Sequence, residues 1–170
     1  MRKQMGRLMA GATVAAVVAG VASYSQQRAE ATFSAPVNVS VTANVASNCV
    51  MTAGSVAFGA YDPLVTHAAT NLDQDGSVSV ACVKGTSANI GLGNGSNFSG
   101  SRRMTNGTDF LDYQLYTTGG RTTIWDTTNR VNYVAASKAS TSLTIFGRVP
   151  SNQDVSAGSY TDTVVAQAEF

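Results

Sequence analysis

The chain has 170 residues, with 11 basic and 10 acidic side chains, a formal net charge of +1 and 44% hydrophobic residues. The few charges form no basic field, which argues against a nucleic-acid partner. The abundance of Ser, Thr, Asn, Gly and Val is typical of an exported β-protein with polar loops.

The first 31 residues have the pattern of a signal peptide. A basic start (Arg2, Lys3 and Arg7) precedes an apolar run from 8 to 22 and a small-x-small site at 29–31, so we expect cleavage after Ala31. Cleavage near Ala22 is the alternative. The apolar run 8–22 is shorter than a membrane anchor requires. Cleavage leaves 170 − 31 = 139 residues, with 7 basic and 9 acidic side chains, a suitable length for one domain.

The next segment, 32–46, alternates between apolar and polar residues without a break. Its apolar positions are Phe33, Ala35, Val37, Val39, Val41, Ala43 and Val45. Successive side chains on a strand point to opposite faces, so this pattern predicts a ribbon with one apolar face. Such a ribbon can be the first strand of its own domain, or it can bury its apolar face in another molecule.

Short alternating runs separated by turn residues continue to the end of the chain, and no run predicts a helix. We expect strands at 50–58, 77–84, 89–92, 111–116, 122–126, 131–135, 142–148 and 160–170. The turn at 118–121 predicts a hairpin, whereas 59–76 and 93–109 are long polar loops. Seven or more short strands indicate a β-sandwich of the immunoglobulin type.

The final expected strand runs into the end of the sequence without a turn. It places Val164, Ala166, Ala168 and Phe170 on one face. An apolar strand at the start and an end in mid-strand suggest a sandwich that is one strand short. We therefore expect these four residues to form an acceptor edge, completed by a partner strand through β-augmentation.

Cys49 and Cys82 are the two cysteines of the chain. In an exported protein they predict one disulfide, worth roughly 3–4 kcal/mol in the loop-entropy model. Their spacing matches no metal motif, and His67 is the only histidine. We expect no metal site.

Other chemical motifs give no coherent site, so we expect no enzyme, organic cofactor or bound nucleotide. The glycine-rich run 91–95 lacks the Lys-Ser/Thr of a phosphate loop. Arg102-Arg103 is typical of a solvated surface, and Trp125 of core or hairpin packing rather than a carbohydrate platform. The aspartates lie mostly in turns, where they bond their own backbone, and 73–76 lacks the downstream glutamate of a calcium loop.

Several short motifs together resemble the spore coat protein U domain family, which includes the pilus subunits of archaic chaperone–usher systems. The motifs are Asn48-Cys49, 56–63 (Val-Ala-Phe-Gly-Ala-Tyr-Asp-Pro), Val80-Ala81-Cys82, Arg102-Arg103-Met104, 113–117 (Tyr-Gln-Leu-Tyr-Thr), Ile124-Trp125-Asp126, 146–150 (Phe-Gly-Arg-Val-Pro) and 157–164 (Ala-Gly-Ser-Tyr-Thr-Asp-Thr-Val). Their order and spacing match over about 47–170, except that Asp126 stands where the family often has glycine.

The resemblance implies an all-β, incomplete immunoglobulin-like sandwich (47–170) that lacks its final strand and is completed by a donor strand. It also implies that the extension 32–46 is that donor strand. The implied partners are a periplasmic chaperone, an outer-membrane usher and further copies or related pilus subunits. The function expected is a subunit of an exported surface fibre acting in adhesion and biofilm formation. A spore or cell coat protein and a glycan-binding adhesin are the alternatives.

Overall fold

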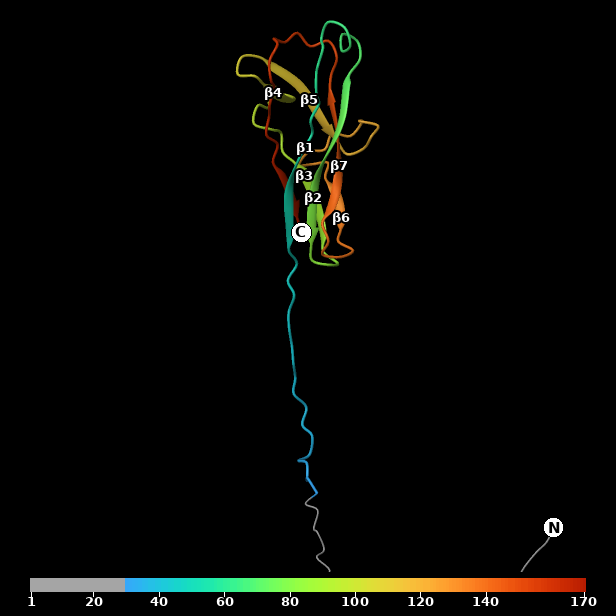
Figure 1. The fold of residues 1–170 in the computed structure, drawn as a ribbon, viewed down its shortest axis with the longest axis vertical. Helices are drawn as coiled ribbons and strands as arrows, with labels where there is room; N and C mark the ends of the chain where they lie inside the picture. The colour runs from blue at the N-terminus through green and yellow to red at the C-terminus, as the bar shows by residue number, and fades with distance from the viewer. Residues whose placement is uncertain (1–29) are drawn as a thin grey trace, which may run out of the picture. The chain divides into compact units, whose positions relative to one another are not determined.

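The computed structural model describes residues 30–170 (Figure 1). The signal-peptide prediction at 1–31 lies almost entirely outside this range. Contacts divide the chain into one unit ending at Thr42 and another from Ala43 to Phe170, and the second unit holds every strand. Within the described range, no helix is long and apolar enough to cross a membrane.

The folded unit contains eight strands and no helix among its described residues. In chain order they are β1 (Cys49–Ser55), β2 (Leu72–Cys82), β3 (Ser87–Leu92), β4 (Arg102–Thr105), β5 (Phe110–Tyr116), β6 (Val131–Val134), β7 (Thr141–Val149) and β8 (Ala166–Glu169). All strand pairs are antiparallel. The expected all-β class is therefore confirmed.

The strands form two sheets packed as a sandwich. One sheet has the order β1-β2-β7-β5-β4, and the other has the order β6-β3-β8. β1 is therefore an edge strand of the larger sheet, and β8 is an edge strand of the smaller sheet. The first residues of β1 and the C-terminus lie at the same end of the unit (Figure 1).

Apolar residues at alternate positions of the strands fill the space between the sheets. In β2 the buried positions are Val78, Val80 and Cys82, and in β5 they are Leu111, Tyr113 and Leu115. Ile90, Trp125 and Val149 complete the most deeply buried set, each no more than 1% exposed. The period of two in the sequence thus identifies which face of each strand is buried.

The structure corrects several expected boundaries. The two long loops are shorter than expected because β2 already begins at Leu72 and β4 lies inside 93–109. The expected strand at 122–126 is reduced to a bridge between Tyr116 and Ile124, with the turn closed by a bond from the Arg121 amide to the Thr118 carbonyl. The expected strand at 160–170 is regular only at Ala166–Glu169.

Candidate functional site: the groove between β1 and β8

The outer edge of β1 carries backbone groups that point away from its partner strand. The Val83 amide donates to the Asn48 carbonyl at 2.9 Å, and Cys49 pairs with Cys82 in the next position of the register. Hydrogen-bonded and non-hydrogen-bonded pairs alternate in an antiparallel ladder, so Cys49 and Met51 direct their N–H and C=O groups outward. Their side chains pack against the core.

β8 has the matching arrangement on the other sheet. The Gly93 amide donates to the Val165 carbonyl at 2.8 Å, and Ala166 and Ala168 pair with Leu92 and Ile90. By the same alternation, the backbone groups of Ala166 and Ala168 point away from β3. Their side chains, like that of Val164, are half-buried against the core. The two open edges thus present free backbone groups beside apolar side chains.

A groove runs between these two edges, and we call it the β1–β8 groove. One cavity of about 540 Å³ is bounded by 51–56 on one side and by Tyr160, Thr161, Asp162, Val164 and Ala166 on the other. A second, of about 480 Å³, lies between Cys49 and Met51 and residues 166–170. A third, of about 990 Å³, extends the groove past 57–64 and 152–160.

The direction of the two edges follows from these linings. The start of β1 lies beside 166–170, and its end lies beside 160–166, so β1 and β8 run antiparallel across the groove. Any strand inserted between them would therefore be parallel to one and antiparallel to the other.

The floor of the groove depends on a glycine in β7. A Cβ atom on Gly147 would lie 2.8 Å from both Phe58 and Val56. The missing side chain lets these two residues fold onto the sheet, where the Phe58 ring meets Tyr113 edge-on, with centroids 5.9 Å apart. Val56 and Phe58 line both the 540 Å³ and the 990 Å³ cavities, so they form the shared floor of the groove.

A bulge shapes the β1 wall. The register between β1 and β2 shifts between Thr52 and Ser55. A Cβ on Gly54 would lie 1.5 Å from the Ser77 carbonyl oxygen, and one on Gly76 would lie 2.1 Å from that of Ser55. Only glycine allows the two backbones to approach this closely, and such bulges bend an edge strand locally.

The expected donor residues lie in the segment 30–48, which forms no strand before Cys49. Phe33, Val37, Val39 and Val41 are 81–91% exposed, and Ala35 and Ala43 are exposed as well. Val45, which follows the expected donor residues, is 77% exposed. A row of exposed apolar side chains of this kind commonly marks an interaction surface. The donor role of this segment remains a prediction.

The predicted disulfide is present between Cys49 and Cys82. Their Cα atoms are 4.1 Å apart, as in a close, non-hydrogen-bonded antiparallel pair. β1 has one neighbouring strand, β2, and the disulfide joins these same two strands. The bond therefore fixes the start of this edge strand to the sheet.

Arg102 corrects the expectation that Arg102-Arg103 is a solvated surface pair. Its side chain is 1% exposed and donates to the carbonyls of Leu92, Gly93 and Trp125 and to the Gln114 side chain. Burial lowers the pKa of its guanidinium below the ordinary value. Arg102 therefore joins both sheets close to the groove. Arg103 points elsewhere and stacks over Phe110, 4.2 Å from the ring centroid.

Asp162 fastens the groove wall next to β8. It accepts hydrogen bonds from the Tyr113 hydroxyl at 2.7 Å, the Ser96 amide at 2.9 Å and the Asn97 side chain at 3.1 Å. Burial, followed by this carboxylate, raises the pKa of Tyr113. A Cβ on Gly95 would lie 2.1 Å from an Asp162 oxygen, so glycine is required there.

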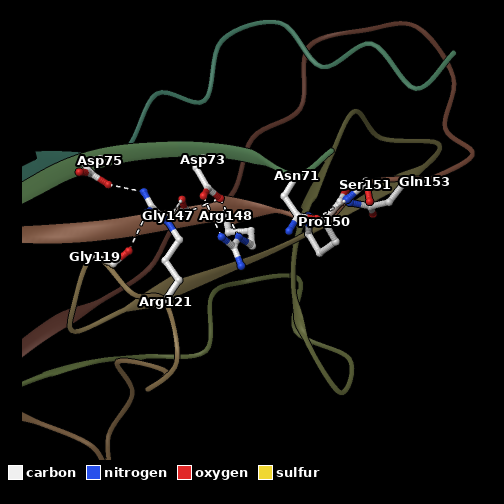
Figure 2. Close-up of polar contacts among 10 residues, drawn as sticks. All are labelled: Asn71, Asp73, Asp75, Gly119, Arg121, Gly147, Arg148, Pro150, Ser151 and Gln153. Atoms are coloured by element: carbon white, nitrogen blue, oxygen red, sulfur yellow. Dashed lines mark hydrogen bonds and ion pairs between the residues drawn. The ribbon is translucent and has the colours of Figure 1, made fainter. Parts of the chain in front are cut away.

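The outer face of the larger sheet is held by ion pairs (Figure 2). Arg148 donates to both oxygens of Asp73, its cross-strand neighbour, at 2.6 and 2.8 Å. Arg121 pairs with Asp75 at 2.6 Å and donates to the Gly147 carbonyl. The bond from Arg148 lowers the pKa of Asp73. These charges are paired on the sheet face, away from the groove.

The other titratable candidates have structural roles. His67 is 7% exposed, accepts the Asp62 amide at Nδ1 and stacks on Tyr61, with ring centroids 5.0 Å apart. Asp62 and Asp126 accept backbone amides of their own turns, which lowers the pKa of each carboxyl. Trp125 is in the core and donates to the Ile90 carbonyl at 2.8 Å. Residues 30–170 hold no cluster of metal-binding side chains.

Phe170 differs from the other three residues expected on the acceptor edge. It lines the 480 Å³ cavity but is 54% exposed and lies outside the core cluster. The regular strand stops at Glu169, so nothing holds the last ring over the core.

Together these features define a structural β-sandwich with two open edges, an apolar groove between them and an exposed, alternating extension. The chain belongs to the Spore Coat Protein U domain family, whose model matches residues 35–167. The match begins inside the exposed extension, twelve positions before the 47 expected from the motifs. The family therefore includes most of the donor segment predicted from the sequence.

Two similar proteins add detail. Protein U of Myxococcus xanthus is 36% identical over 173 residues, covering 92% of this chain and 96% of that protein. Among solved structures, a CsuC–CsuE chaperone–tip adhesion subunit pre-assembly complex from archaic chaperone–usher Csu pili of Acinetobacter baumannii is similar, with a TM-score of 0.51 and 22% identity. That match covers 74% of this chain and 40% of the other, and it supports the fold alone.

Proposed function

We propose that this protein is an exported structural subunit that polymerises into a surface fibre, with residues 33–43 of one copy filling the β1–β8 groove of the next. The observation that carries the proposal is the complementarity of two parts of the chain. The extension has apolar side chains at every second position, and the groove has free backbone edges on either side of an apolar floor. A strand with this pattern pairs with both edges and buries one face.

The apolar contacts offered by the extension are large. Burying Phe33 and the three valines of this segment gives on the order of 10 kcal/mol from apolar area, and backbone pairing adds to this. Ordering the extension opposes binding at roughly 1–2 kcal/mol per residue. The fit must therefore be good along the whole groove, which favours a dedicated partner strand over occasional contacts.

Insertion has a geometric requirement. Some Cα atoms of β1 and β8 lie within 8 Å of each other, whereas a strand between two others needs about 9.5 Å, twice the spacing of neighbouring strands. The edges near Cys49 and Ala168 must separate to admit a donor. This cost fits a protein whose assembly is assisted, so we propose a periplasmic chaperone and an outer-membrane usher as partners. Adhesion and biofilm formation are then the roles of the assembled fibre.

A spore or cell coat assembled from the same strand-in-groove contacts is the second candidate, because the family is named after spore coat protein U and the chain is 36% identical to Protein U. The same contacts would make either assembly. Fibres seen by electron microscopy on cells, absent when the gene is deleted, would favour the first candidate. A continuous shell would favour the second.

The test of strand donation is a pair of substitutions in the extension. Val39→Asp places a carboxylate on the apolar face, where burial without a partner costs several kcal/mol. We expect it to abolish heat-resistant multimers in detergent while the monomer keeps its melting temperature. Ser40→Asp adds the same charge on the opposite face and serves as the control. Normal multimers from Val39→Asp would contradict the proposal, and an unfolded Val39→Asp monomer would place the ribbon in its own sandwich.

A further inference from the structure

The chain has two Asn-Gly dipeptides, Asn94-Gly95 and Asn106-Gly107, and their surroundings differ. Asparagine is a chemically labile residue, above all before glycine, which has no side chain to shield its amide nitrogen. That nitrogen can attack the side-chain amide carbon of the asparagine. The reaction needs a mobile asparagine side chain and a free glycine amide, so the fold decides which of the two dipeptides reacts.

Asn106 is held on every side. Its side-chain oxygen accepts two backbone amides of its own turn at 2.9 and 2.8 Å. Its side-chain nitrogen donates to the hydroxyls of Ser156 and Tyr160 at 3.0 and 3.1 Å. The Gly107 amide is engaged as well, by the Thr105 hydroxyl at 3.0 Å. Attack by this amide must first break these bonds through a local opening, which costs free energy.

Asn94 has none of these restraints. It is exposed just beyond the end of β3, and within residues 30–170 neither its side chain nor the Gly95 amide forms a hydrogen bond. The following position is nevertheless restricted to glycine. Gly95 has a φ of +88°, and a Cβ there would lie 2.1 Å from an Asp162 oxygen. The packing against Asp162 thus fixes a labile dipeptide at an exposed position.

The residues on either side of Asn94 hold the wall of the β1–β8 groove. The Gly93 amide donates to the Val165 carbonyl at 2.8 Å. The Ser96 amide donates to the Asp162 carboxylate at 2.9 Å. Both acceptors belong to the segment that leads into β8, and Asp162 lines the 540 Å³ cavity. The spacing between these two attachments is set by the main chain through Asn94.

We propose that Asn94 deamidates spontaneously and that the product loosens this wall of the groove. The Gly95 nitrogen loses its proton and attacks the Asn94 side-chain carbon, so that a new C–N bond forms and ammonia leaves. Water then opens the five-membered ring at one of its two carbonyls, which gives aspartate or isoaspartate at position 94. In isoaspartate the main chain runs through the side-chain carbon and is one methylene longer. The inference does not depend on strand donation.

The longer main chain is the part of the change that acts on the wall. Gly93 stays fixed, because its carbonyl also accepts the buried Arg102 guanidinium at 2.7 Å. The added methylene therefore displaces Ser96 from Asp162. The new carboxylate is repelled by Asp162 but attracted by Arg102, so its two electrostatic effects oppose each other. We expect the segment 160–166 to open more often after the reaction.

Peptide mapping tests the site of reaction. The mature exported protein is kept folded in mildly alkaline buffer and then digested with trypsin, which places the two asparagines in separate peptides, 85–102 and 104–121. We expect deamidation, located by fragment-ion spectra, to be at least about tenfold faster at Asn94 than at Asn106, because Asn106 reacts only after local opening. In urea with the disulfide reduced, the two rates should converge. Equal rates in the folded protein would overturn the assignment.

Hydrogen exchange tests the effect on the groove. Wild type and Asn94→Gln, whose longer side chain closes such a ring far less readily, are aged in the same way and compared with fresh protein. We expect amide exchange in 160–166 to be about tenfold faster in the deamidated wild type and unchanged in Asn94→Gln. Unchanged exchange in the deamidated wild type, or equal acceleration in Asn94→Gln, would overturn the effect on the wall. Wild-type protein that never polymerises would remove the proposed function and leave this inference intact.

Discussion

Filling the groove should stop assembly without unfolding the domain. Ala166 is half-buried, lines both the 540 Å³ and the 480 Å³ cavities and directs its side chain into the groove. We consider Ala166→Phe, in which the ring takes space that the donor strand would fill. The neighbouring residue, Gln167, is exposed on the other face of β8, so Gln167→Phe is the matched control.

The size of the effect differs between the free and the assembled domain. In the free domain the ring enters an open cavity, so we expect the free energy of unfolding to change by less than about 1 kcal/mol. In the assembly the ring must compete with a donor valine. The valine then loses about 2 kcal/mol from burial, and overpacking costs a further ~1–3 kcal/mol. A total of roughly 3–5 kcal/mol weakens strand binding by about 10²–10⁴-fold.

The assay combines thermal unfolding of the monomer with detergent gels of assembled protein. We expect Ala166→Phe to melt like the wild type and to form no multimers by itself. Because it still carries an intact ribbon, it should add to one end of a growing wild-type polymer and shorten fibres in proportion to its fraction. The reasoning is wrong if Ala166→Phe assembles normally, or if Gln167→Phe blocks assembly equally well.

Three further predictions concern the domain itself. Arg102→Met should lower the free energy of unfolding by about 3–5 kcal/mol in urea titrations, because three buried carbonyls lose their donor; a loss below 1 kcal/mol would mean that water replaces the guanidinium. Changing Cys49 and Cys82 to serine should cost about 2–5 kcal/mol, and an unchanged urea midpoint would contradict this. The lowered pKa of Asp73, caused first by Arg148, stabilises the fold fully above the ordinary value of 3.8 and is lost as the pH falls below it. The melting temperature of Asp73→Asn should therefore fall less steeply in acid than that of the wild type, and equal slopes would refute the linkage.

The alternation of the sequence predicted most of the sandwich for a simple reason. A strand between two layers buries every second side chain, and this is visible in 77–84 and 111–116 without any knowledge of partners. The disulfide was equally accessible, because an exported chain with two cysteines offers one intramolecular pairing. The strand order was not accessible, since nothing local in β2 shows that it pairs with β7, far along the chain.

The errors have identifiable physical causes. Arg102 and Arg103 look alike in the sequence, but adjacent strand residues point to opposite faces, so one enters the core while the other remains on the surface. Apart from the Gln114 side chain, the acceptors of Arg102 are main-chain carbonyls, for which the sequence carries no signal. Thr161 meets Thr105 only in an isolated bridge, so the expected strand at 160–170 becomes regular only near its end.

In the free domain the open edges of β1 and β8 are only partly covered. At the Cys49 end, the approach of β1 and β8 to within 8 Å covers apolar atoms but leaves outward backbone groups of Cys49, Met51, Ala166 and Ala168 without a strand. Toward the other end, the Gly54 bulge bends β1 and the cavities widen. A strand entering there meets an open floor before it must separate the edges, so its gain in burial can offset that separation step by step. The same geometry that leaves the domain incomplete thus gives an incoming strand a place to begin.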